Sequence, residues 1–114
     1  MQVRVEPSSR TPLYRQIADQ IRGALARAEL GPGDRLPVAR DLAAALDVNL
    51  QTVLRAYAEL RDEGLVEVRR RRGVTVVASP ARADLSISAR RLVEGARRVG
   101  LADDAIVRLV EAHL

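Results

Sequence analysis

Turn-forming residues recur at short intervals in the first 64 residues of the chain. Their spacing limits the length of each helix, and it constrains the fold more than any other feature. Gly31-Pro32-Gly33-Asp34 combines a glycine suited to a helix C-terminus with a strong turn signal. Asp47-Val48 suits a tight corner, because aspartate tolerates the left-handed conformation that glycine adopts more readily. Gly64 is a further stop signal. The spacing predicts three short helices that share one core.

Apolar residues recur at helical spacing within each of the three segments. The first segment opens at Thr11-Pro12, an N-cap followed by proline at the first helical position, and Pro37 can open the second. Asn49 is a good N-cap for the third, and Arg40 points away from the inward face of the second. The residues expected to face the core are Leu13, Ile17, Ile21, Ala24 and Ala28, then Val38, Leu42, Ala45 and Leu46, then Val53, Ala56, Tyr57 and Leu60.

Two valine-rich stretches, residues 65–69 and 74–78, alternate like the strands of a hairpin. The tip carries Arg70, Arg71, Arg72 and Gly73 directly after Arg69, so four arginines lie side by side. Their mutual repulsion would be relieved beside phosphates or a narrow minor groove, where the potential is negative. The simpler alternative is that the run is only solvated.

The sequence changes character after Ser79-Pro80, where two further helices separated by Gly100 are expected. The second of these begins near Asp103-Asp104, whose charges suit a helix N-terminus, and Leu101 could pack on Ile106. The predicted fold is therefore mostly α with a small β-hairpin: a winged helix-turn-helix domain over residues 1–78 and a helical tail over residues 79–114.

Composition limits the function classes. With 114 residues the chain is one domain, or a small domain with an appendage, and without Phe or Trp its core must consist of Leu, Val, Ile and Ala. The absence of Cys excludes disulfides and thiolate metal sites and fits a reducing cytoplasm, and the lone His113 cannot make a metal site. No run of about 18 apolar residues occurs, so neither a signal peptide nor a membrane span is expected. No catalytic constellation or cofactor motif is present, so we expect no enzyme and no cofactor.

The start of the third helix predicts contact with double-stranded DNA. A helix fits the major groove with its N-terminal side chains against base edges. Asn49 and Gln51 carry amides that can pair with adenine, Thr52 can bond to a base or phosphate, Leu50 could touch a thymine methyl, and Arg55 is expected to grip phosphate. All nineteen basic residues are arginine, whose guanidinium can donate two parallel hydrogen bonds to a phosphate or to the edge of a guanine.

Each of these residues also has a simpler interpretation. Asn49 and Thr52 could serve only as caps, and Gln51 could be a solvated side chain. Leu50 and Leu54 could pack against a neighbouring element instead of a base. A winged helix can also bind protein or RNA, because a fold does not determine its function.

Three stretches of the sequence resemble the GntR family of bacterial transcription regulators. They are TPLYRQIADQIRGALARAELGPGDRLPVARDLAAALDV, NLQTVLRAYAELRDEGLVEV and RRRRGVTVV, which together span residues 11–77. The PLYxQI opening, the PGDRLP turn, the TVxRAYxEL helix, the EGL stop and the glycine-bearing hairpin tip are specific in combination.

The resemblance implies which residues contact DNA. Val38, Asp47, Leu50, Leu54 and Arg71 depart from the family's usual residues, which bears on the operator sequence. The contacts implied by the resemblance are Arg40, Leu50, Gln51, Thr52 and Leu54 in the helices, with Arg70, Arg71, Arg72 and Gly73 at the hairpin tip.

The short tail resembles that of the YtrA-like subfamily, which implies a homodimer, a repressor of an inverted-repeat operator and a linked transporter operon. Two short helices cannot enclose their own core, so their apolar residues favour pairing with a second chain. The alternative is that both helices fold back on their own winged domain. A small-molecule effector at the dimer seam and the sign of regulation stay open. The residues expected in the interface are Leu85, Leu92, Val93, Val99, Ile106, Val107, Leu109, Val110 and Leu114.

Overall fold

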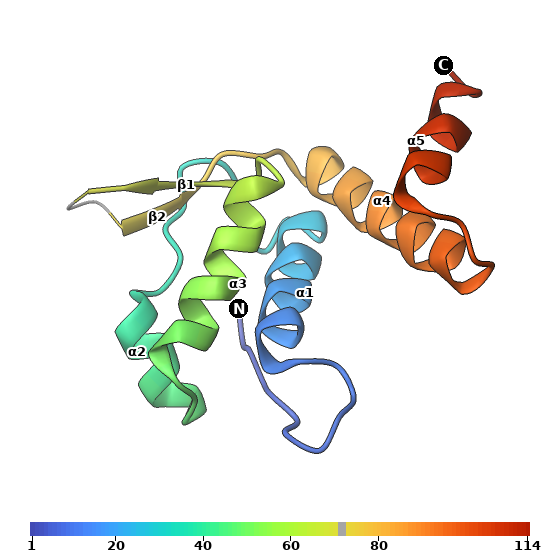
Figure 1. Ribbon diagram of the computed structural model, residues 1–114. Coiled ribbons are helices and arrows are strands. Elements are labelled where there is room, and N and C mark those ends of the chain that lie inside the picture. The colour runs from blue at the N-terminus through green and yellow to red at the C-terminus, as the bar shows by residue number, and fades with distance from the viewer. Residues whose placement is uncertain (71–72) are drawn as a thin grey trace.

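The helices and the hairpin follow one another in the order that the turn signals predict (Figure 1). The computed structural model describes residues 1–70 and 73–114. Its described part contains α1 (Leu13–Ala26), α2 (Ala39–Leu46), α3 (Leu50–Asp62), β1 (Val66–Arg69), β2 (Gly73–Val76), α4 (Pro80–Arg98) and α5 (Asp103–Glu111). The prediction of a mostly helical chain with one small hairpin is confirmed.

The core lies where α1 and α3 pack together, with α2 on one side of α3 and α4 on the far side of α1 (Figure 1). Ile17, Ile21 and Leu25 contribute from α1, and the predicted inward face of α3 is buried in full. That face consists of Val53, Ala56, Tyr57 and Leu60, whose spacing of three and four residues places them on one side of the helix.

The corner between α2 and α3 has the predicted conformation. Asp47 adopts φ 54° and ψ 49°, in the left-handed region, and its N–H closes the end of α2 on Ala43 and Ala44. Gly64 ends α3 with φ 78°, and Gly100 separates α4 from α5 with φ 87°. The stops predicted at these glycines are confirmed.

The first helix differs from the prediction at both ends. Its N-cap is Pro12 rather than Thr11, and no side chain caps it. It ends at Ala26, and Ala28 is exposed with φ 61° instead of facing the core. The left-handed turn at Ala28 ends the helix before the glycine that the sequence singles out.

Two residues that the sequence predicts to face the core from the second helix are exposed instead. Val38 is 63% exposed because the helix begins only at Ala39, so helical phase does not set the direction of the Val38 side chain. Ala45 is exposed, and Ala43 is buried beside Leu42 in its place. The buried stripe is thus shifted by part of a turn from the predicted one.

Two glutamine side chains hold the N-terminal segment against α1. The carboxamide of Gln20 accepts a hydrogen bond from Arg4 N at 2.8 Å and donates to the Arg4 carbonyl. One turn earlier, Gln16 accepts from Glu6 N at 2.8 Å and donates to the Glu6 carbonyl at 3.0 Å. The two side-chain amides satisfy backbone N–H and C=O groups of the N-terminal segment, as a neighbouring strand would. They hold the segment so that Val3 and Val5 pack against the core.

The first half of the tail packs on its own domain. Ser79 caps α4 by accepting from Arg82 N at 3.2 Å, and Ala83 and Ser86 are buried where α4 packs against α1. The helix α5 stands away from α1 and α3 (Figure 1). The alternative of a tail folded back on the winged domain therefore describes α4 and not α5.

Replacement of Tyr57 by Phe should lower the free energy of unfolding by about 1–2 kcal/mol, because it leaves a carbonyl without its partner. The buried Tyr57 hydroxyl donates to the Pro37 carbonyl at 2.7 Å and so ties α3 to the start of α2. Burial raises the pKa of the Tyr57 phenol above its ordinary value, so the hydroxyl keeps the proton that it donates even in mildly alkaline solution. Urea unfolding measures the loss. Tyr14→Phe is the matched control, since the Tyr14 hydroxyl makes no hydrogen bond among the described residues; an equal loss in both variants contradicts this role.

Candidate nucleic-acid interface

The start of α3 presents polar side chains to solvent in a defined geometry. Asn49 is the N-cap, and its side-chain oxygen accepts from Gln51 N at 2.8 Å. The prediction that Asn49 caps this helix is confirmed. The Gln51 side chain is exposed, and Thr52 beside it is half-buried. The side-chain amide of Gln51 makes no hydrogen bond among the described residues and is open to a ligand that approaches the end of the helix.

The other helical residues predicted to contact DNA surround this end of α3. Arg40 is exposed on α2. Leu50 is half-buried, and Leu54 is 41% exposed one turn further along α3. Their roles in binding stay predictions, but Arg40 and Leu54 leave enough surface open for a partner to reach them.

Arg55 has a contact within the chain that the sequence did not reveal. Its guanidinium lies 3.8 Å from the centre of the Tyr14 ring, so a cation–π contact links α3 to the start of α1. The residue as a whole remains exposed. Stacking limits the rotamers of the side chain and orients the charge that we expect to grip phosphate.

The hairpin is antiparallel, with Arg69 opposite Gly73. Gly73 has φ 73°, a left-handed conformation that explains the glycine at this end of the turn. Arg70 is exposed in the turn, and Arg69 pairs with Glu67 at 2.7 Å. Arg71 and Arg72, which we also predict to contact DNA, lie outside the described residues.

The PGDRLP turn runs along β2 and forms backbone hydrogen bonds with it. Sequence reasoning missed this contact. Leu36 N donates to the Val74 carbonyl and Gly33 N to the Val76 carbonyl, each at 2.8 Å. Arg35 forms a bridge with Thr75. Main-chain hydrogen bonds of this kind leave no side-chain pattern, so only the folded chain shows that this turn supports the wing.

A hollow of about 490 Å³ separates α3 from the hairpin. Exposed apolar side chains of Val38, Leu54 and Val68 line it. Arg35 and Arg61 also line it and are exposed. Sequence reasoning assigned Val38 to the core and did not select Arg35 or Arg61. The hollow places apolar and cationic groups between the two elements predicted to touch DNA.

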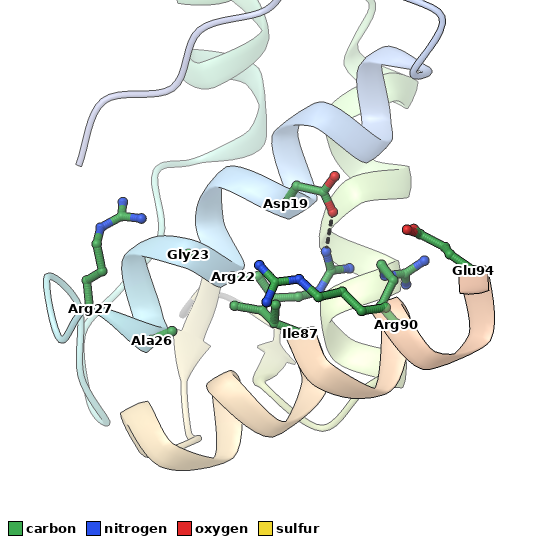
Figure 2. A pocket seen from close by; sticks show the side chains of 9 residues that line it. Asp19, Arg22, Gly23, Ala26, Arg27, Ile87, Arg90 and Glu94 are labelled. Atoms are coloured by element: carbon green, nitrogen blue, oxygen red, sulfur yellow. Dashed lines mark hydrogen bonds and ion pairs between the residues drawn. The ribbon is translucent and has the colours of Figure 1, made fainter. Parts of the chain in front are cut away.

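A buried arginine holds the other end of α3. Arg22 on α1 is 1% exposed, and its guanidinium reaches Glu59 and Glu63 of α3 at 2.6 Å each. Burial acts to lower the pKa of Arg22, but the hydrogen bonds that its guanidinium donates to Glu63 and Glu59 outweigh this effect and raise the pKa. Figure 2 shows Arg22 paired with Asp19 on its own helix, at 2.6 Å, with Arg90 and Glu94 of α4 alongside.

The tail residues predicted to form a dimer interface are mostly exposed. Leu85 is 63% and Val99 76% exposed, and Val93 is half-buried. Ile106 differs, because it is already buried within the chain. The remaining exposed members are Leu92, Val107, Leu109, Val110 and Leu114.

The described residues show neither a metal centre nor a membrane span. No group of three or more His, Cys, Asp or Glu residues in ranges 1–70 and 73–114 could hold a metal ion. No helix in the same ranges is both long and apolar enough to cross a bilayer.

The fold and this surface define a winged helix-turn-helix module, in which α2 and α3 are the helix-turn-helix and the hairpin is the wing. The chain belongs to the GntR family of DNA-binding transcription regulators, because the family described as "Bacterial regulatory proteins, gntR family" matches residues 13–76.

Individual relatives agree with this assignment. The chain is 39% identical over 74 residues to the HTH-type transcriptional repressor YtrA of Bacillus subtilis, a match covering 65% of this chain and 57% of that protein. It is 36% identical over 107 residues to the HTH-type transcriptional regulator Rv1152 of Mycobacterium tuberculosis, covering 93% and 88% respectively. The structure of YtrA from Sulfolobus acidocaldarius superposes with a TM-score of 0.63 at 41% identity, covering 81% of this chain and 97% of that one. The chain spans less than two thirds of the length of B. subtilis YtrA, and these relatives are regulators, not enzymes.

Replacement of Asn49 by Asp should separate capping from DNA binding. An aspartate keeps the cap acceptor and favours the positive end of the helix dipole, so thermal stability should be maintained. Its negative charge would meet phosphates, so affinity for duplex DNA should fall, by about tenfold at low salt. Fluorescence anisotropy with labelled DNA and thermal unfolding measure the two effects. Affinity equal to that of the wild type would show that Asn49 lies outside the interface.

Proposed function

We propose that this chain is a homodimeric repressor that binds an inverted-repeat operator in double-stranded DNA. The observation that carries the proposal is the capped start of α3, where the Gln51 side chain is exposed, together with the exposed Arg70 in the turn of the hairpin. A helix end of this kind can enter the major groove while the hairpin lies along the neighbouring backbone.

The proposed contacts divide into base contacts and backbone contacts. Gln51 reads an adenine through its amide, and Leu50 and Leu54 contact thymine methyl groups. Arg40, Thr52 and Arg55 bind phosphates and set the register of α3 on the duplex. Arg70, Arg71, Arg72 and Gly73 form the tip of the wing, where the cationic side chains meet phosphate or the minor groove.

A single winged helix covers one short half-site, so specific binding calls for two chains with half-sites about 34 Å apart. The exposed apolar side chains of the tail support pairing there. An isologous two-fold interface between tails would match the symmetry of an inverted repeat. Repression follows when the bound dimer covers a promoter, which we propose is that of its own operon, with a linked transporter gene.

Variants of α3 and of the wing should affect DNA binding in different ways. Gln51→Ala should change the preferred base at one position of each half-site, at a cost of about 1–3 kcal/mol. The combined change of Arg70, Arg71 and Arg72 to Ala should weaken binding to all duplexes and flatten the dependence on salt. Selection of bound duplexes from a random pool, followed by salt titration, measures both effects. Selected sites without an inverted repeat, or identical sites for wild type and Gln51→Ala, contradict the proposal, and preferential capture of RNA would favour the rival function.

The double change of Leu92 and Val110 to Asp should convert the dimer to a monomer, because charges would replace two half-exposed apolar side chains of the interface. Analytical ultracentrifugation measures the mass in solution. Asp84→Ala with Glu111→Ala is a control on the same two helices, with both residues exposed and neither in an ion pair among the described residues. A double-Asp variant that stays dimeric would remove the tail from the interface.

A further inference from the structure

Two carboxylates at the C-terminal end of α3 form ion pairs with arginines of α1 and α4. Glu59 and Glu63 lie one turn apart on α3 and both accept from the buried Arg22 of α1. Arg15, also on α1, reaches Glu59 at 3.2 Å. We call Arg15, Arg22, Glu59, Glu63 and Arg90 the arginine–glutamate cluster. It lies at the opposite end of α3 from the residues proposed to read DNA.

Arg90 is the member of this cluster that α4 contributes. Its Nη2 lies 3.4 Å from Glu59 Oε1 and 3.5 Å from Glu63 Oε2. Near the start of α4, Arg82 Nη2 donates to the Glu63 carbonyl at 3.2 Å. The apolar packing of α4 is against α1, so polar contacts from these two arginines tie α4 directly to α3. Figure 2 shows the Arg90 side chain projecting from α4 toward Arg22.

We infer that Arg90 is a positioning residue that sets the spacing of the two half-sites, an inference that rests on the proposed dimeric function. The helix α4 carries part of the apolar tail surface, and α3 carries the DNA contacts. The angle between α4 and α3 therefore determines how far apart, and in what orientation, a dimer displays its two recognition helices. An ion pair between the two helices favours one angle, because its strength falls as the charges separate.

The size of the effect follows from helix geometry. From Arg90 to Arg98, the last residue of α4, the helix continues for about 12 Å at 1.5 Å per residue. A tilt of about 10° moves its end by about 2 Å, and two protomers double that to about 4 Å, close to the roughly 3.4 Å rise of one base pair. A modest loosening of this link is therefore enough to accept a spacer one base pair longer or shorter.

Arg90 is better suited to a test than Arg22. Arg22 is 1% exposed, and its removal would leave Glu59 and Glu63 without their closest partner, whereas the Arg90 side chain is 24% exposed and shares its carboxylates with two other arginines. Arg90→Met keeps the volume of the stem and removes the charge. The fold should therefore survive this change while the angle between α4 and α3 becomes less restricted.

The experiment measures affinity for duplexes that carry both selected half-sites with spacers altered in steps of one base pair. The wild type should lose about tenfold or more in affinity at one base pair from the best spacer. Arg90→Met should lose less than about threefold over the same step, with unchanged affinity for a duplex holding one half-site. Arg90→Lys, which keeps the charge, should retain most of the wild-type preference. Thermal unfolding of each variant shows whether it is folded.

Arg91→Met is the matched control, because Arg91 is the next residue of α4, is exposed and has no ion pair among the described residues. It should keep the sharp preference of the wild type. A sharp preference that survives in folded Arg90→Met, or an equal loss in Arg91→Met, overturns the positioning role and leaves the proposed function standing. A wild type that binds no duplex, or shows no preferred spacing, overturns the proposed function together with this inference.

Discussion

The burial of one guanidinium governs how α3 is held against α1. Arg22 lies almost fully inside the chain, and it stays charged because Glu59, Glu63 and Asp19 surround it. Removing one partner of a buried pair of this kind costs about 3–5 kcal/mol, since the other is left without compensation. The crossing of α1 and α3 therefore depends on a polar contact as well as on the apolar face around Ile21 and Leu60.

The two ends of α3 serve separate purposes. At the N-terminal end the Asn49 side chain accepts from the backbone N–H of Gln51, and the Gln51 side chain is exposed. At the C-terminal end, Glu59 and Glu63 pair with arginines of α1, so their charges hold α3 against α1. The wing is braced independently, through the main-chain bonds of Leu36 and Gly33 to β2. A capped helix and a hairpin supported by main-chain hydrogen bonds suit the proposed binding to a duplex.

The tail combines two of the alternatives that its sequence left open. Ala83 and Ser86 bury one face of α4 on α1, while Leu85 and Val99 remain exposed. One helix thus contributes to its own domain and still offers an apolar surface. The buried residues of α4 are small or polar, so they carry no hydrophobic signal in the sequence.

The sequence by itself determined the element order, the stops at Asp47, Gly64 and Gly100, the cap at Asn49 and the family, because these depend on local backbone preferences and short-range motifs. Only the tertiary structure decided the salt links from Arg22 and Arg90 to α3, the stacking of Arg55 on Tyr14 and the place of Val38 beside the wing. These contacts join residues far apart in the chain, and a charged or exposed side chain gives no periodic signal of its partner. Helical phase also predicts nothing for a residue such as Val38, which lies just before its helix begins.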